Sequence, residues 1–478
     1  MRRSHAVRWA GPVSNWLLVV LVAVSLALAA LLWSIAPPPF TVGLLQGGSQ
    51  PYATPESVPN SLGDLLMPVS IDIAAAGSPV RMVTDSPADG AVFDAAWKGV
   101  LQTVKGLSPQ DLQGGAIATW DEAAAALTAV CPASAGTACA VGGFQLQFAT
   151  ALPWAAIWEA ADGGDWPATA PDPSVRRLVL TSGANGTQMW VLSAAGGLRI
   201  AVSAAGEVVL EKILGQGAQA GSAADPLAAG GALNVVPGIY VPAQLPSLAP
   251  VSVLAEQLAP DALAGALFPD LLEVSKATGS GGATAYHDPQ GRALTVNTAT
   301  GTVRYIAPPS GSASGGPGDT AAQLFDVYRF VTGNGGWPPE AFVFDITSSG
   351  GSVGYGFGTR YHGYPVVGSL APIFVDMRGV TPLGYDRQVP VPGSAAGSTP
   401  SPWIAPDKAL QTLATGAFVQ LPQGTVQEVS DVFPAFYETG TILRPVWAVA
   451  VHASAPARGG LALVDASSGD AVAFLPGQ

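Results

Sequence analysis

Residues 175–213, VRRLVLTSGANGTQMWVLSAAGGLRIAVSAAGEVVLEKI, decide the fold. Four apolar or alternating runs follow one another there, separated by short turns rich in Gly, Ala and Ser: 175–180, 188–192, 198–202 and 208–213. Short runs so closely spaced predict strands that each pair with the next one. We therefore expect an antiparallel meander over this stretch.

The flanking sequence continues this mixture of short strands and occasional helices. Residues 67–73 alternate as a strand does, and Trp97, Val100, Leu101 and Val104 recur at helical spacing. The remaining patterns predict helices near 260–267, from Asp319 and from Pro406, and a hairpin at 293–306. Further strands are expected at 235–241, 342–346, 354–360, 372–376, 443–451, 461–464 and 471–475. The expected fold class is α+β, with antiparallel sheets and few helices.

Two short segments echo each other. Residues 295–301, TVNTATG, and 463–469, LVDASSG, both end a strand and turn at a Gly, and each precedes a second short strand. The echo predicts one hairpin design used twice, with chance similarity between β-hairpins as the alternative.

Residues 16–36, WLLVVLVAVSLALAALLWSIA, form an apolar run that is long enough, as a helix of about 31 Å, to cross a bilayer. Three Arg precede the run (Arg2, Arg3, Arg8), and no charge follows before Glu56. This asymmetry predicts a single-pass anchor in the cytoplasmic membrane, with the N-terminus inside and a large domain outside. A cleaved signal peptide is the alternative, but its apolar region is normally shorter.

The predicted anchor has two faces of small residues. One face carries Ala23, Ala27, Ala30 and Ser34, and the nearly opposite face carries Ser25 and Ala29. Small residues let membrane helices approach closely, so these positions are the predicted contacts with partner helices. The alternative is that Ala merely fills the span.

Composition divides the rest of the chain into segments. With 478 residues, 58 Gly and 42 Pro, the chain is too long for one ordinary core and rich in turns. Stretches rich in Pro, Gly, Ala and Ser predict a stalk and two linkers. The predicted organisation is a cytoplasmic tail at 1–15, the anchor at 16–36, a stalk at 37–61, and extracytoplasmic α+β domains at 62–214, 232–307 and 319–478.

The formal charge of −13 excludes one class of partner. An acidic surface repels phosphate backbones and anionic headgroups, so we expect no nucleic-acid binding.

Cys131 and Cys139 are the only two Cys in the chain. They fall outside the predicted membrane span, where disulfides persist, and we expect a bridge between them. Two free thiols or a metal pair remain alternatives, although two Cys without a nearby His do not complete a tetrahedral zinc site.

The sequence carries no local catalytic signature. His287, His362 and His452 are far apart, and neither a nucleophile elbow nor a phosphate-binding loop is present. The Gly-rich run 354–358 lacks the spacing of a dinucleotide site. We therefore expect no metal, no cofactor and no enzymatic activity.

Several segments, in order, resemble the YycH family. The anchor and its following prolines, LVAVSLALAALLWSIAPP at 21–38, resemble the start of these proteins. The later matches are Tyr240-Val-Pro242, Ala266-Leu-Phe268-Pro-Asp270, Ala285-Tyr-His-Asp288, Leu294-Thr-Val296, Tyr305, Gly335-Gly-Trp337 and Tyr361-His-Gly-Tyr-Pro-Val366. One departure is Tyr286-His-Asp-Pro289, where the family has Tyr-Thr-Asp-Gly.

The resemblance implies a regulatory role. YycH proteins are membrane-anchored regulators of the essential cell-wall sensor histidine kinase WalK (YycG) of Gram-positive bacteria, acting with a sister protein, YycI. The implied partners are a WalK/YycG-like kinase and a YycI-like protein, contacted through the transmembrane helix and the outer domains. Two other hypotheses remain: an envelope-binding or protease-inhibitor-like module on a membrane tether, and an anchored hydrolase that uses one of the three outer His.

Overall fold

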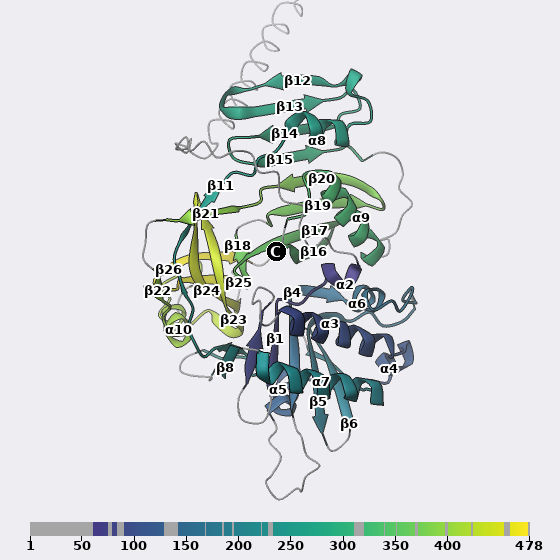
Figure 1. Ribbon diagram of the computed structural model, residues 1–478, viewed down its shortest axis with the longest axis vertical. Coiled ribbons are helices and arrows are strands. Elements are labelled where there is room, and N and C mark those ends of the chain that lie inside the picture. The colour runs from purple at the N-terminus through teal and green to yellow at the C-terminus, as the bar shows by residue number, and fades with distance from the viewer. Residues whose placement is uncertain are drawn as a thin grey trace, which may run out of the picture. The chain divides into compact units, whose positions relative to one another are not determined.

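The structure is a computed structural model. It describes residues 61–74, 79–83, 90–128, 142–167, 169–183, 186–193, 196–220, 222–227, 233–309, 320–338, 340–349, 351–368, 371–396, 400–421, 424–453 and 459–476. All of them belong to one compact unit, Gln50–Gln478. Nearly all the described strands lie in a nine-stranded sheet and a fifteen-stranded sheet (Figure 1).

The first sheet is built from the amino-terminal part of the described chain. Its order is β3-β7-β6-β5-β4-β1-β2-β8-β9, and every pair is antiparallel. The strands are β1 Ser70–Ala74, β2 Val80–Met82, β3 Ala116–Ala118, β4 Gly143–Pro153, β5 Ser174–Gly183, β6 Gly186–Ser193, β7 Gly196–Ala201, β8 Ser222–Pro226 and β9 Tyr240–Pro242. The helices are α2 Leu62–Leu65, α3 Gly90–Lys105, α4 Pro109–Gln113, α5 Trp120–Thr128, α6 Trp154–Ala160 and α7 Ala204–Ala220.

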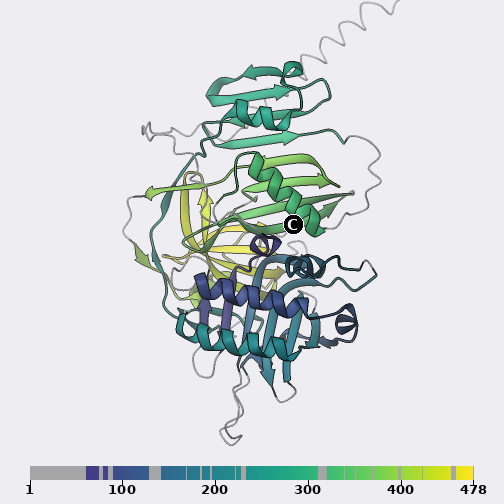
Figure 2. The same cartoon turned by 45° about the vertical axis from the view of Figure 1, so that its right-hand side comes forward.

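The predicted meander is confirmed for its first three strands, which are β5, β6 and β7. The fourth prediction is wrong, because residues 208–213 lie inside α7. There, Leu210 and Ile213 are buried three residues apart while Val208 is 65% exposed, which is the spacing of a helix with one apolar face. Figure 2 shows α3 and α7 side by side on one face of this sheet.

The second sheet uses one unit three times: a helix followed by a four-stranded antiparallel meander. The first unit has α8 Pro260–Leu267 with β12 Ser275–Thr278, β13 Ala283–His287, β14 Ala293–Asn297 and β15 Thr302–Ile306. The second has α9 Thr320–Gly333 with β16 Phe342–Ser349, β17 Ser352–Tyr361, β19 Ile373–Arg378 and β20 Thr381–Arg387. The third has α10 Pro406–Ala414 with β23 Val426–Thr439, β24 Ile442–Ala453, β25 Gly460–Asp465 and β26 Ala471–Pro476.

Two connections join the three meanders. Strand β15 pairs with β20. Strand β18, Tyr364–Val367, pairs antiparallel with β17 on one side and parallel with β23 on the other. The remaining elements are β10 Ser247–Leu248, β11 Val251–Leu254, β21 Val391–Ala395, β22 Ser401–Pro402 and the 3₁₀ turns η2 Leu271–Glu273 and η3 Ser280–Gly282. One continuous sheet therefore runs through the second and third predicted domains, whose boundaries stay predictions.

The echoed hairpin is confirmed. The Asn297 side chain accepts hydrogen bonds from the N–H groups of Ala299 and Thr300 after β14. The Asp465 side chain accepts them from the N–H groups of Ser467 and Ser468 after β25. Each is an Asx turn, which suits a short polar side chain at a strand end.

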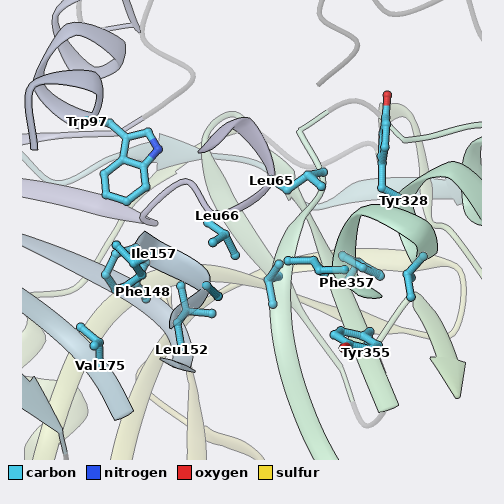
Figure 3. Close-up of a cluster of buried hydrophobic side chains, with 14 of the residues drawn as sticks. Leu65, Leu66, Trp97, Phe148, Leu152, Ile157, Val175, Tyr328, Tyr355 and Phe357 are labelled. Carbon is cyan, nitrogen blue, oxygen red and sulfur yellow. The ribbon is translucent and has the colours of Figure 1, made fainter. Parts of the chain in front are cut away.

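One apolar cluster reaches from the first sheet into the second meander (Figure 3). It includes Leu65, Leu66, Trp97, Phe148, Leu152, Ile157, Val175, Tyr328, Tyr355 and Phe357. The described residues are thus α+β, with mostly antiparallel sheets and few helices, as predicted. None of their helices is long and apolar enough to span a bilayer. The predicted anchor at 16–36 lies outside them.

Candidate functional site

The predicted site residues lie outside the described part of the chain. This applies to Ala23, Ser25, Ala27, Ala29, Ala30 and Ser34 of the anchor, and to Cys131 and Cys139. The partner-helix contacts and the disulfide therefore stay predictions.

The polar residues singled out in the sequence belong to separate elements. His287 is exposed in β13, His362 occupies the turn before β18, and His452 is exposed in β24. No group of three metal-binding side chains occurs in the described ranges.

The Gly-rich run in β17 makes room for aromatic rings. A Cβ on Gly354 would lie 2.5 Å from the Phe374 ring, and one on Gly358 would lie 2.7 Å from the Phe342 ring. This run therefore serves packing within its own sheet.

Charged side chains that the sequence analysis missed meet where the first sheet faces β23. Their base is a buried ion pair between neighbouring strands: Arg81 of β2 donates from Nε to Asp72 Oδ1 at 2.6 Å and from Nη2 to Asp72 Oδ2 at 3.1 Å. Burial alone lowers the pKa of Arg81, but the adjacent Asp72 carboxylate outweighs burial and leaves it raised. Gln145 of β4 donates to Asp72 Oδ2 at 2.9 Å and to the Gly238 carbonyl at 2.7 Å.

The network then crosses to the third meander. Gln147 of β4 donates to Asp431 Oδ2, and Arg177 of β5 donates to the Ser430 carbonyl at 3.1 Å. Arg177 Nη2 also lies 3.8 Å from Asp431 Oδ1. Burial lowers the pKa of Arg177, and the Asp431 charge partly offsets this. We call Asp72, Arg81, Gln145, Gln147, Arg177 and Asp431 the seam; all six are buried.

A small cavity adjoins the seam. Trp120, Gln145, Arg177 and Gly238 line it, and the Arg177 guanidinium lies 4.5 Å from the centre of the Trp120 ring. Its volume of about 10 Å³ is roughly that of one water molecule, so no organic ligand fits there. The seam therefore has a structural role: one buried ion pair lies inside the first sheet, and a second pair of opposite charges faces across from the first sheet to β23.

A second buried ion pair ties the connection before α8 to the second meander. Arg387 of β20 donates to Glu256 from Nε at 2.8 Å and from Nη2 at 2.5 Å. It also donates to the carbonyls of Gly335 and Gly336, at 3.1 and 2.8 Å. Gly335 has φ 116°, and a Cβ there would lie 3.2 Å from the guanidinium. The main chain of the Gly335-Gly-Trp337 segment thus binds the Arg387 guanidinium through two carbonyl groups.

The sequence around Asp72 and Arg177 indicates that these charged residues are buried. Asp72 stands between two buried Ile, and Arg177 lies inside β5, directly before the buried run Leu178-Val179-Leu180. A charge inside an apolar strand is rarely buried without a partner, so each predicts an unknown counter-charge. The partner's position is set only by the fold.

Comparisons with known proteins agree at the level of fold. Neither a protein-family model nor a curated protein matches the chain. Among solved structures, the crystal structure of YycH from Bacillus subtilis is similar with a TM-score of 0.55 and 14% identity, covering 83% of this chain and 97% of YycH. The C-terminal domain of Bacillus megaterium YpeB (TM-score 0.29, 11% identity, 47% of this chain and all of that one) is too distant to argue from. An uncharacterised protein from Eubacterium rectale is also too distant to argue from, with a TM-score of 0.34 and 11% identity over 52% of this chain and 93% of that one. The chain therefore has a YycH-like fold.

Proposed function

We propose that this chain is a membrane-anchored regulator of a two-component system, and that it modulates a cell-wall sensor histidine kinase from outside the cytoplasmic membrane. The observation that carries the proposal is the YycH-like fold, which extends over 83% of the chain. The segments of the sequence that resemble the YycH family, taken in order, motivate the same proposal.

The internal construction suits a protein that works by contact. Buried ion pairs join the first sheet to β23 and the connection before α8 to β20. Separating either pair would leave a buried charge without its partner, which costs free energy. Each junction therefore favours one arrangement of its strands. A body joined in this way presents fixed surfaces to its partners and needs no catalytic centre.

The proposed partners are a WalK/YycG-like kinase and a YycI-like sister protein. The transmembrane contacts are assigned to the small faces at Ala23, Ala27, Ala30 and Ser34, and at Ser25 and Ala29. Small residues let partner helices approach closely, so the two faces suit two different helices.

A photo-crosslink in native membranes tests the proposal. A crosslinking residue replaces Ala27, Leu28 serves as the neighbouring-face control, and mass spectrometry identifies the adducts. We expect a sensor kinase or a small anchored regulator to be trapped at Ala27 and not at Leu28. A correctly inserted protein that forms no protein adduct at any anchor position contradicts it.

A further inference from the structure

Strand β12 is the outermost strand of the first meander, and no described strand pairs with its outer edge (Figure 1). All four of its residues are exposed. The preceding turn η2 exposes Leu271 by 49% and Leu272 by 96%. By contrast, most side chains of β26, the outer strand of the third meander, are partly buried. We call residues 270–278 the β12 edge.

The register of β12 shows which main-chain groups face outward. Gly279 N–H donates to the Ala283 carbonyl at 2.8 Å, and the facing residues then run Thr278–Thr284, Ala277–Ala285 and Lys276–Tyr286. Hydrogen-bonded and non-bonded pairs alternate along antiparallel strands. The N–H and C=O groups of Lys276 and Thr278 therefore point away from β13, toward a strand that would lie outside β12.

Natural edge strands are commonly protected by being short, by charged side chains such as Lys, by a Pro or by a bulge. Strand β12 is four residues long and carries one Lys, but it lacks the last two protections. The β12–β13 register is regular, and the strand contains no Pro. Its one Lys is held sideways: Lys276 Nζ lies 2.6 Å from Asp261 Oδ1 of α8, which also accepts the Tyr286 hydroxyl. The edge is thus left able to pair.

Charge indicates what kind of strand fits. Asp270 and Glu273 flank the two exposed Leu, are themselves exposed, and form no ion pair with any described residue. Because the whole chain carries −13, a second copy would be repelled, whereas a basic segment would be attracted.

We propose that the β12 edge docks an extended segment of another protein, one that carries apolar and basic side chains. The segment pairs with the main chain of Lys276 and Thr278 and rests on Leu271 and Leu272, in the manner of strand addition to a sheet edge. This inference uses only the outer part of the chain and does not depend on the kinase assignment.

The test uses the full chain in lipid nanodiscs and a labelled peptide of alternating Val and Lys. Fluorescence anisotropy measures its affinity. Thr278→Pro removes an outward N–H and leaves the β13 ladder intact, so we expect binding about tenfold weaker. Leu272→Ser should also weaken binding. The matched control is Val419→Ser, which changes another apolar residue that is 92% exposed and should leave the affinity unchanged.

The peptide itself supplies a second measurement that is independent of protein folding. N-methylation of the alternate residues that face β12 should abolish binding, and N-methylation of the intervening residues should not. The proposal is overturned if N-methylation of either set of alternate residues weakens binding equally. It is also overturned if the unmodified peptide does not bind, or if Thr278→Pro binds it as tightly as the wild type. A chain that sediments as a dimer and becomes a monomer with Thr278→Pro also overturns it, because the occupant is then a second copy.

Discussion

Glu256 and Arg387 form a bidentate ion pair across 131 residues of sequence, and the two side chains are 1% and 0% exposed. Such a pair fixes the connection before α8 against β20. Burial alone lowers the pKa of Arg387, but the Glu256 hydrogen bonds more than reverse this, so the guanidinium stays charged.

Removing one partner of this pair should leave a buried charge uncompensated. Glu256→Ala is expected to destabilise the compact unit Gln50–Gln478 by about 3–5 kcal/mol, measured by urea unfolding. The control is Asp326→Ala, which removes an exposed pair with Arg329 and should cost less than about 1 kcal/mol. Equal losses in the two variants would show that burial of the Glu256 pair contributes nothing.

The backbone conformation of Gly335, next to Arg387, leads to a second prediction. Because its φ is 116° and Arg387 lies close, Gly335→Ala should destabilise the protein by about 1–3 kcal/mol. Gly333, two residues earlier at the end of α9, has no atom within 4 Å of a built Cβ. Gly333→Ala should therefore be neutral or slightly stabilising in the same thermal melt.

The seam predicts energetic coupling across two sheets. Arg177→Met and Asp431→Leu should each be destabilising, because each leaves an opposite charge buried and less well paired. In a double-mutant cycle the two losses should not add, with an interaction energy of about 0.5–3 kcal/mol. Additive losses would mean that the 3.8 Å approach of these side chains has no energetic weight.

The paired Asx turns allow a pH experiment. Burial tends to raise the pKa of Asp465, but hydrogen bonds from Ser467 and Ser468 leave it below its ordinary value of 3.8. A depressed carboxyl pKa contributes stability above pH 3.8, and this is lost as the pH falls through the lower folded pKa. Asp465→Asn places at this turn the residue found at position 297. It should reduce the loss of folding stability at acid pH.

The measurement compares urea midpoints at about pH 6 and about pH 3 for wild type and Asp465→Asn. The difference between the two pH values should be smaller in the variant. An unchanged difference would show that other carboxyls dominate acid unfolding.

The sequence predicted the elements whose signal is local. Strands β5 to β7 follow from short apolar runs and tight turns, and α10 follows from Pro406 at its first turn. Residues 208–213 misled because Val208 and Val209 favour strands, while burial at Leu210 and Ile213 decides for a helix. Propensity is a weak guide wherever tertiary packing chooses the buried face.

The buried networks were beyond prediction for a different reason. Gln147 and Asp431 are 284 residues apart, so no window of sequence contains both. The resemblance to the YycH family, in contrast, was noticed without any knowledge of contacts, and a YycH-like fold is what the structure has. The predicted helix contacts and the Cys pair rest on the sequence alone.

The position of Asp431 also sets an order of events for a chain made from its amino terminus. Arg177 and Gln147 belong to strands completed early, yet the carboxylate that satisfies them is among the last fifty residues. A chain that stops short of residue 431 therefore lacks the carboxylate that lies beside Arg177 and accepts the Gln147 hydrogen bond. Truncation at the carboxyl end thus removes a partner from the core of the amino-terminal sheet.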